Sequence, residues 1–98
     1  MTVVARRWWV RGRVQGVWFR GFTRAEASTL GLVGTVRNLS DGRVEVEVAG
    51  DAEKVEALRK RLLVGPEMAR VEGLDEDSAL SDGESERIRR STSFEMIR

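Results

Sequence analysis

The first pattern along the chain is an alternation of period two between positions 8 and 14. Trp8, Val10 and Val14 share one parity, and Trp9 and Arg11 lie on the other. This alternation is typical of a strand that buries one face. The sequence therefore predicts a first strand over about 8–14.

A helical pattern follows this strand. Phe19, Thr23, Ala27 and Leu30 are spaced four, four and three residues apart, so a helix would place them on one face. Gly31 comes directly after the last of them and is a suitable helix stop. We expect a helix over roughly 20–30.

Two further strands are predicted on either side of a tight turn. Between positions 34 and 49, Ser40-Asp41-Gly42 separates two strand-like runs. Asp-Gly allows the positive φ that a tight hairpin requires. In the second run valines alternate with glutamates, which indicates one buried and one polar face.

A second helix is expected after Asp51, which is a candidate N-cap. Gly65 and Pro66 mark its end. Its predicted stripe consists of Ala52, Val55, Leu58, Arg59 and Leu62.

The last third of the chain is dominated by charge. Strands are expected from Ala69 and over 94–97, but 75–86 holds six acids and 87–90 holds three arginines. We interpret 75–93 as a solvated loop, with mobility or a short hidden strand as open alternatives.

The order strand, helix, strand, strand, helix, strand predicts an α+β, ferredoxin-like βαββαβ fold. We expect an antiparallel sheet with two helices on one face and a short closing C-terminal strand. A chain of 98 residues has room for one domain, 1–98. This fold alone does not determine a function.

Composition narrows the possible chemistry. A formal net charge of +1 gives no broad field that would attract nucleic acid or a membrane. The chain has no cysteine and no histidine, which removes thiolate nucleophiles and the commonest base and metal ligand. No apolar run reaches the ~20 residues of a membrane span, and the first residues lack a secretory signal, so a cytoplasmic location is expected.

The stretch from Gly12 to Arg20 joins the first strand to the first helix, where backbone N–H groups can bind an anion. Gly16 lets the backbone come close, and the guanidinium of Arg20 suits two phosphoryl oxygens. The alternative is that the glycines only turn the chain, Arg20 lies in solvent, and Trp18 and Phe19 fill the core. For Phe19 we favour the core.

Two motifs in this order carry a family resemblance. Gly12-x-Val14-Gln15-Gly16-Val17-x-Phe19-Arg20 closely resembles the first signature of the acylphosphatase family. Gly34-Thr35-Val36-Arg37-Asn38-Leu39-Ser40-Asp41-Gly42-Arg43-Val44-Glu45 resembles the second. The resemblance covers about 8–74 and 93–98, and the charged stretch between them matches no family motif.

The resemblance implies an enzyme that hydrolyses small acyl phosphates to a carboxylate and inorganic phosphate. It implies that Asn38 orients the attacking water. The carboxylates of 75–86 lack a metal-binding pattern, so we expect that no metal or other cofactor takes part. The implied phosphate-binding residues are Gln15, Gly16, Val17, Trp18, Phe19 and Arg20. Neither motif contains a base, so we expect the water to pass its proton to a phosphoryl oxygen. From the residues alone, a turn former before the hairpin is the favoured interpretation of Asn38, and the family resemblance reverses that preference.

Two other functions remain open. An RNA-binding module would need exposed aromatics on the central strands, but 43–48 has none and carries acids. Trp9, on the polar parity of its strand, is a candidate partner contact, although we favour exposure by chance. A sensor of phosphate or carbamoyl phosphate would use the same loop, since acylphosphatase-like domains also occur within larger enzymes. We favour a free-standing, monomeric hydrolase with no nucleic-acid or membrane partner.

Overall fold

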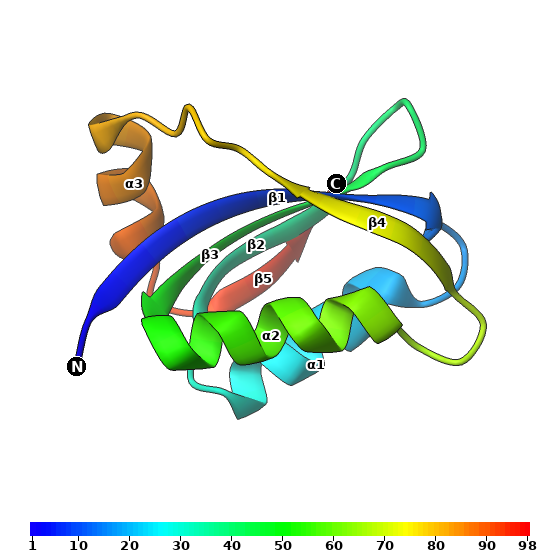
Figure 1. The fold of residues 1–98 in the computed structure, drawn as a ribbon, viewed down its shortest axis with the longest axis horizontal. Coiled ribbons are helices and arrows are strands. Elements are labelled where there is room, and N and C mark those ends of the chain that lie inside the picture. Colours follow the sequence, from blue (N-terminus) through cyan, green and yellow to red (C-terminus); the bar gives the residue numbers. More distant parts are fainter.

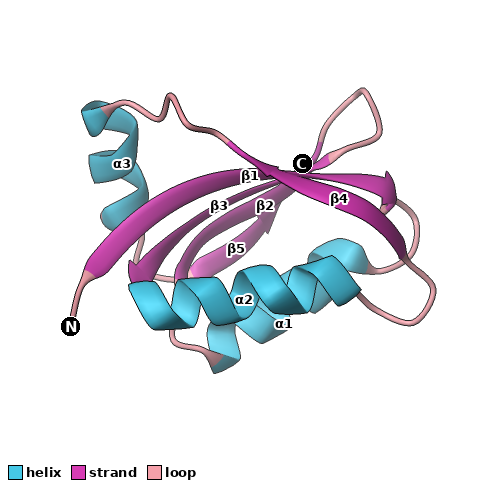
Figure 2. Cartoon of the chain, viewed as in Figure 1, coloured by secondary structure: helices cyan, strands magenta, loops and turns pink.

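A computed structural model describes residues 1–98 as a five-stranded sheet with helices on both faces (Figures 1 and 2). In chain order the elements are β1 (Val3–Arg13), α1 (Phe19–Thr29), β2 (Val33–Asn38), β3 (Val44–Asp51), α2 (Ala52–Val64), β4 (Arg70–Glu76), α3 (Asp82–Arg89) and β5 (Phe94–Ile97). The predicted ferredoxin-like order is confirmed, with α3 inserted before the closing strand. None of the helices combines the length and apolar character needed to cross a membrane.

The order of strands across the sheet determines which chain segments meet. The order is β4-β1-β3-β2-β5, and β3 pairs antiparallel with both β1 and β2. β5 pairs parallel with β2, which is the one departure from the expected antiparallel sheet. Because β1 and β2 oppose the same strand, they run in the same direction, and β5 runs with them. The carboxyl ends of β1, β2 and β5 therefore lie at the same end of the sheet.

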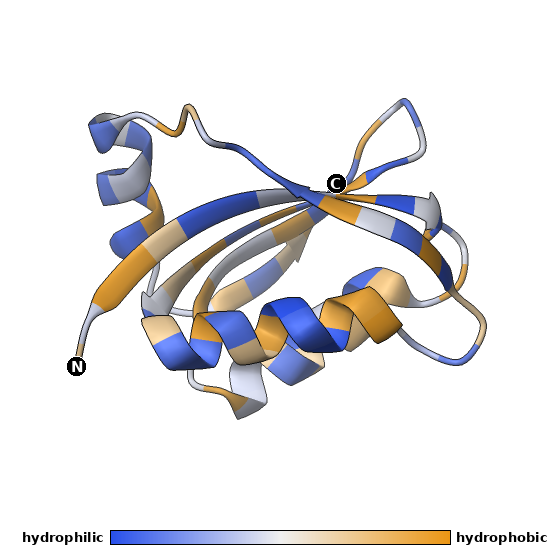
Figure 3. Cartoon of the chain, viewed as in Figure 1, coloured by the Kyte–Doolittle hydropathy of each residue, from blue (hydrophilic) through white to orange (hydrophobic).

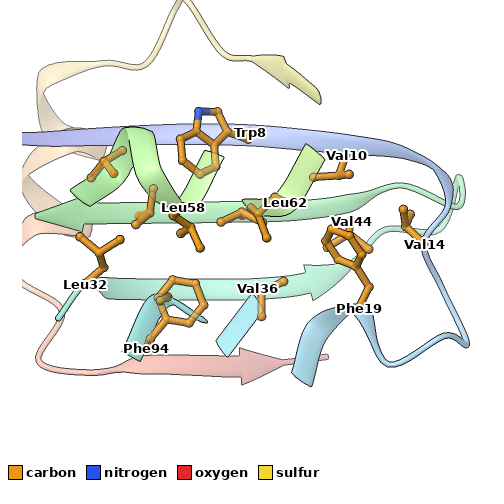
Figure 4. Close-up of a cluster of buried hydrophobic side chains, with 14 of the residues drawn as sticks. Trp8, Val10, Val14, Phe19, Leu32, Val36, Val44, Leu58, Leu62 and Phe94 are labelled. Atoms are coloured by element: carbon orange, nitrogen blue, oxygen red, sulfur yellow. The ribbon is translucent and has the colours of Figure 1, made fainter. Parts of the chain in front are cut away.

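One face of the sheet packs against α1 and α2 and forms the main hydrophobic core (Figure 4). Trp8 and Val10 enter it from β1, while Leu58 and Leu62 enter it from α2, as the two periodicities predict. Burying a leucine side chain stabilises the fold by about 1.5–3 kcal/mol. The core therefore fixes the positions of α1 and of the β1 end that precedes it.

The second predicted helix is confirmed, but the side chain expected to cap it does not do so. Asp51 occupies the N-cap position of α2, yet its side chain makes no capping hydrogen bond. The N–H of Ala52 instead donates to the carbonyl of Thr2, at 2.8 Å. Asp51 is also the last residue of β3 and pairs with Val3. Sheet pairing to the start of β1 thus replaces the side-chain cap.

The prediction of a solvated loop over 75–93 is wrong, because this stretch contains the end of a strand and a helix. β4 extends to Glu76, and α3 follows it as a largely hydrophilic helix (Figure 3). Ser81 and Glu84 form a reciprocal capping box at its start. Its one buried residue, Ile88, packs in a small cluster with Ala5 and Ala49, on the sheet face opposite α1 and α2. Capping hydrogen bonds and ion pairs stabilise this helix in place of a buried apolar face. Its sequence therefore lacks the hydrophobic period from which a helix is predicted.

Ion pairs join α3 to this outer face of the sheet. Arg7 of β1 donates to Glu47 Oε2 at 2.6 Å and to Asp77 Oδ2 at 3.0 Å, and it also pairs with Glu84. Arg87 of α3 contacts both carboxylate oxygens of Glu47 at 3.0 Å. Burial alone would raise the pKa of Glu47, but the hydrogen bonds from Arg87 and Arg7 outweigh it and hold that pKa below its usual value. Glu47 is therefore the centre of the contact between α3 and the sheet.

Glu47→Gln should destabilise the fold in a pH-dependent way. The pKa of Glu47 is lower in the folded chain than its usual 4.5, so its stabilisation is present above that value and is lost as the pH falls through the folded pKa. We expect a loss of about 1.5–3 kcal/mol at about pH 7, which shrinks as the pH falls below 4.5 and through the lower pKa of the folded chain. Urea unfolding of both proteins across this range measures the difference.

Glu56→Gln is the matched control, because Glu56 makes an exposed pair with Arg59 within α2. The free energy that Glu56→Gln costs should be much smaller than that of Glu47→Gln at every pH, because solvent screens the exposed pair. A loss in Glu47→Gln that does not change with pH would show that the charge of Glu47 does not hold α3 to the sheet.

Candidate active site

The carboxyl ends of β1, β2 and β5 surround a hollow of about 190 Å³ at the start of α1. Its lining residues come from the loop after β1, the first turn of α1, the end of β2, and β5. They are Val14, Gly16, Trp18, Phe19, Arg20, Gly21, Asn38 and Met96. The structure thus brings together Arg20 and Asn38, which lie 18 residues apart in the sequence and were both predicted to act in one site.

The loop that lines this hollow has backbone N–H groups without a partner in the protein. Gly16 and Trp18 have positive φ values of 73° and 64°, so the loop over 14–18 turns sharply before α1. None of the N–H groups of residues 15–21 donates a hydrogen bond within the protein, and no side chain caps α1. Unpaired N–H groups at a helix start carry partial positive charge and bind anions. The predicted phosphate-binding stretch therefore has donors available.

The side chains of this loop divide between the core and solvent. Val14, Val17 and Phe19 are buried in the main hydrophobic cluster, so the core interpretation of the Phe19 side chain is correct (Figure 4). Trp18 is 67% exposed, which rules out the interpretation that it fills the core. Buried side chains on both sides of Gly16 and Trp18 hold the backbone of the loop in place. Any contact of Val17 and Phe19 with phosphate would therefore come from their backbone N–H groups.

Arg20 lines the hollow from the first turn of α1. Its Nη1 atom donates to the carbonyl of Ile97 on β5, at 3.2 Å. No carboxylate pairs with its guanidinium, in contrast to Arg7, Arg37 and Arg43 elsewhere in the chain. Its positive charge thus adds to that of the free N–H groups, and the contact with β5 limits where the side chain can point.

Asn38 is the last residue of β2 and lies at the wall of the same hollow. Its Oδ1 atom is buried and has no hydrogen-bond partner. Leaving a buried polar atom unpaired costs about 1–3 kcal/mol, so such an atom in a hollow is a candidate contact for water or a ligand. A residue that served only as a turn former would not need its amide in this position.

Gln15 has a side-chain contact that the sequence did not indicate. Its Nε2 atom donates to the carbonyls of Leu39 and Arg43, at 2.8 and 2.9 Å. These two residues close the hairpin that follows Asn38. Gln15 was predicted only as part of the phosphate-binding stretch, and its side chain instead ties that stretch to the hairpin. A lone glutamine beside a glycine gives no sequence signal for two distant carbonyl partners.

The chemistry available in the hollow is restricted. Arg20 is the only ionisable side chain in its lining, and Met96 and Gly21 are lining residues that sequence reasoning did not identify. No three or more Asp, Glu, His or Cys side chains are grouped in a way that could hold a metal ion. The site can therefore bind a tetrahedral anion and contact a water molecule, but its lining offers no acid or base that titrates near neutral pH.

Trp9, the candidate partner contact, is half-buried on the outer face of the sheet. Its indole N–H donates to Glu45 Oε2 at 3.1 Å, and the guanidinium of Arg43 lies 5.4 Å from the ring centroid. Both contacts come from β3 and the residue just before it. They explain the position of Trp9 within the chain itself, and a partner contact stays a prediction.

Comparisons with known proteins agree with this geometry. The sequence matches the Acylphosphatase family model over residues 6–96. An acylphosphatase of Solibacter usitatus is 49% identical over 86 residues, which cover 87% of this chain and 90% of the relative. The structure of an acylphosphatase from Coxiella burnetii is similar with a TM-score of 0.84 at 29% identity, and the match covers 97% of this chain and 93% of that one.

A much longer protein contains a similar unit. The crystal structure of HypF from T. kodakarensis matches 97% of this chain with a TM-score of 0.78 at 29% identity, but the match covers only 12% of the HypF chain. The same fold therefore occurs both in small acylphosphatases and within a longer chain. The family match over residues 6–96, together with the Solibacter usitatus relative matched over 90% of its length, shows that this chain belongs to the acylphosphatase family.

Proposed function

We propose that the chain hydrolyses the carboxyl–phosphate bond of small acyl phosphates, with Arg20 and the N–H groups of residues 15–20 binding the phosphoryl group and Asn38 orienting the attacking water. As a member of the acylphosphatase family, the chain is an acyl phosphate phosphohydrolase. The observation that carries the residue assignment is a hollow whose lining contains residues with free backbone N–H groups, a guanidinium without a carboxylate partner and an amide oxygen without a hydrogen bond.

Phosphate binding follows from the charge of the hollow. A phosphoryl group carries negative charge on three oxygens, which match the N–H groups of the loop and the planar guanidinium of Arg20. Phosphoryl transfer passes through a loose transition state, so catalysis consists mainly of positioning and charge stabilisation. Donors that the fold already holds in place need no reorganisation as charge develops.

Asn38 supplies the contact for water. Its Oδ1 atom accepts a hydrogen bond from the water, whose oxygen then attacks phosphorus on the side opposite the leaving group. The new O–P bond forms as the bond from phosphorus to the acyl oxygen breaks, and that electron pair leaves with the carboxylate. A carboxylate is a weakly basic leaving group, so no general acid is required.

The proton of the water goes to a phosphoryl oxygen in this scheme. The lining of the hollow contains no side chain that could act as a base near neutral pH, because arginine stays protonated there. The products are a carboxylate and inorganic phosphate, and no metal ion or other cofactor enters the balance. The whole chain, 1–98, would act as one monomeric domain on a small-molecule substrate.

Arg20→Ala should nearly abolish turnover. Removing a single donor matched to the transition state lowers the rate by about 100- to 1000-fold. Release of phosphate from acetyl phosphate, measured in a chelator, gives kcat/KM for both proteins. The matched control is Arg90→Ala, which removes an exposed arginine at the end of α3, on the outer face of the sheet, and should change kcat/KM less than about 2-fold.

A wild-type chain that is folded and binds phosphate without releasing it from acetyl phosphate would favour the sensor over the hydrolase. Equal activity of Arg20→Ala and the wild type would show that Arg20 takes no part in the reaction, although the chain still hydrolyses acetyl phosphate. Loss of activity in the chelator would contradict the metal-free scheme.

Asn38→Ala should lower kcat by about 100-fold with little change in KM, because it removes a contact to water and not one to phosphate. Its free energy of unfolding should stay the same or rise slightly, since the deleted oxygen has no protein partner. Steady-state kinetics and urea unfolding measure the two effects. Ser40→Ala, an exposed change in the same hairpin, is the control. A rise in KM alone would contradict the role in orienting water.

The kcat for acetyl phosphate should be independent of pH between about 5.5 and 9, since no titrating side chain lines the hollow. Phosphate release at saturating substrate, corrected for the spontaneous reaction, gives this profile. A single ionisation or a bell shape in kcat within that range would reveal an enzyme base that the proposed mechanism lacks.

A further inference from the structure

A second hollow, of about 350 Å³, opens beside the phosphate site. Its lining consists of Trp18, Gly21, Arg24, Ala25, Ser28 and Met96. Trp18, Gly21 and Met96 line both hollows. A molecule whose phosphoryl group occupies the first hollow can therefore extend directly into the second.

Trp18 has an unusual conformation for a large side chain. It is the only residue other than glycine with a positive φ, and 67% of it is exposed. Its indole N–H has no acceptor in the protein, whereas those of Trp8 and Trp9 donate to glutamates. A strained backbone that presents an aromatic ring to solvent is a reason to look for a function of that ring. The position also lies at an open residue of the first signature, so the motif itself does not require tryptophan there.

Gly21 lets the indole lie close against α1. A Cβ atom at Gly21 would collide with the Nε1, Cε2 and Cδ1 atoms of Trp18, so the ring lies over the helix backbone at this point. Met96, which is 43% exposed, lines the same two hollows from β5. Trp18 and Met96 thus provide apolar surface on the path between the hollows.

We propose that Trp18 and Met96 form an acyl shelf, a surface that binds the acyl group of the substrate and favours flat, apolar acyl groups. The inference rests on the proposed hydrolysis, because it requires the phosphoryl group to occupy the first hollow. The carbonyl carbon then leaves that hollow through the shared wall. An aromatic acyl group can stack on the indole and contact the Met96 thioether. The methyl group of an acetyl phosphate covers little of either surface.

The polar residues of the second hollow limit the apolar stretch. Ala25 continues the apolar surface along α1, while Arg24 and Ser28 are the polar members of the lining. A single ring or a short chain therefore meets apolar surface next to the phosphate site, and longer groups reach polar side chains. Benzoyl phosphate is accordingly a suitable probe, and acetyl phosphate is its matched small counterpart.

The test compares kcat/KM for benzoyl phosphate and acetyl phosphate in the wild type, Trp18→Asn and Trp18→Phe. Asparagine tolerates a positive φ, so it removes the ring without forcing the loop to move, and phenylalanine keeps a ring. Trp18→Asn should lose about 5- to 20-fold with benzoyl phosphate, mainly through KM, and clearly less with acetyl phosphate, because the backbone N–H of residue 18 is kept. Trp18→Phe should retain most of the preference.

Methionine variants give an independent readout outside the loop. Met96→Ala should lower kcat/KM for benzoyl phosphate by about 2- to 5-fold and leave acetyl phosphate unchanged. Met68→Ala, which changes a 65% exposed methionine that lines neither hollow, should leave both substrates unchanged. The inhibition constant of inorganic phosphate should change less than the KM for benzoyl phosphate in every variant, because the substitutions keep the backbone N–H groups of the loop and the side chain of Arg20.

The outcomes separate the shelf from the reaction. Hydrolysis of both substrates with equal losses in Trp18→Asn overturns the shelf and leaves the proposed function standing. If Trp18→Asn also weakens inhibition by phosphate, Met96→Ala decides, and an unchanged preference in that variant overturns the shelf. A folded wild type that hydrolyses neither substrate overturns the proposed function and the shelf with it.

Discussion

β1, β2 and β5 run in one direction, and this constraint brings the site together. β3 lies antiparallel between β1 and β2, and β5 pairs parallel with β2, so three carboxyl ends meet beside the start of α1. Two specific contacts then fix how the loop, the hairpin and the Arg20 side chain lie relative to one another. Gln15 ties the loop after β1 to the hairpin after Asn38, and Arg20 is held by the carbonyl of Ile97. The predicted chemistry depends on these contacts because loose positioning weakens catalysis by orientation.

The outer face of the sheet and the hollow at the strand ends use charge in opposite ways. On the outer face, Arg7 and Arg87 both pair with Glu47 and hold α3 in place. At the hollow, Arg20 has no carboxylate partner and the neighbouring N–H groups have no acceptor. Paired charges stabilise a fold, whereas unpaired donors held by buried side chains are available to an anion. The near-zero net charge of the chain therefore conceals a local positive site.

Periodicity and turn chemistry predicted most of the fold, because the helices and strands of the main core bury one face each. The prediction was wrong for α3, since a polar helix stabilised by Ser81, Glu84 and ion pairs has no hydrophobic period. The two sequence motifs predicted Arg20 and Asn38 as site residues, and the structure places both in the lining of one hollow. The contacts of Gln15 and the position of Met96 could not be predicted, because they depend on residues brought together only by strand order.

The most direct test of this account is a titration of the ¹⁵N-labelled chain with inorganic phosphate, followed by NMR in a chelator. The account predicts that the backbone N–H signals of residues 15–21, the Arg20 guanidinium and the Asn38 side-chain amide shift together with one dissociation constant. Signals of α3 and the outer face should stay unchanged. Shifts confined to the outer groove, which Arg37 and Arg87 line, with none in the loop, would contradict it.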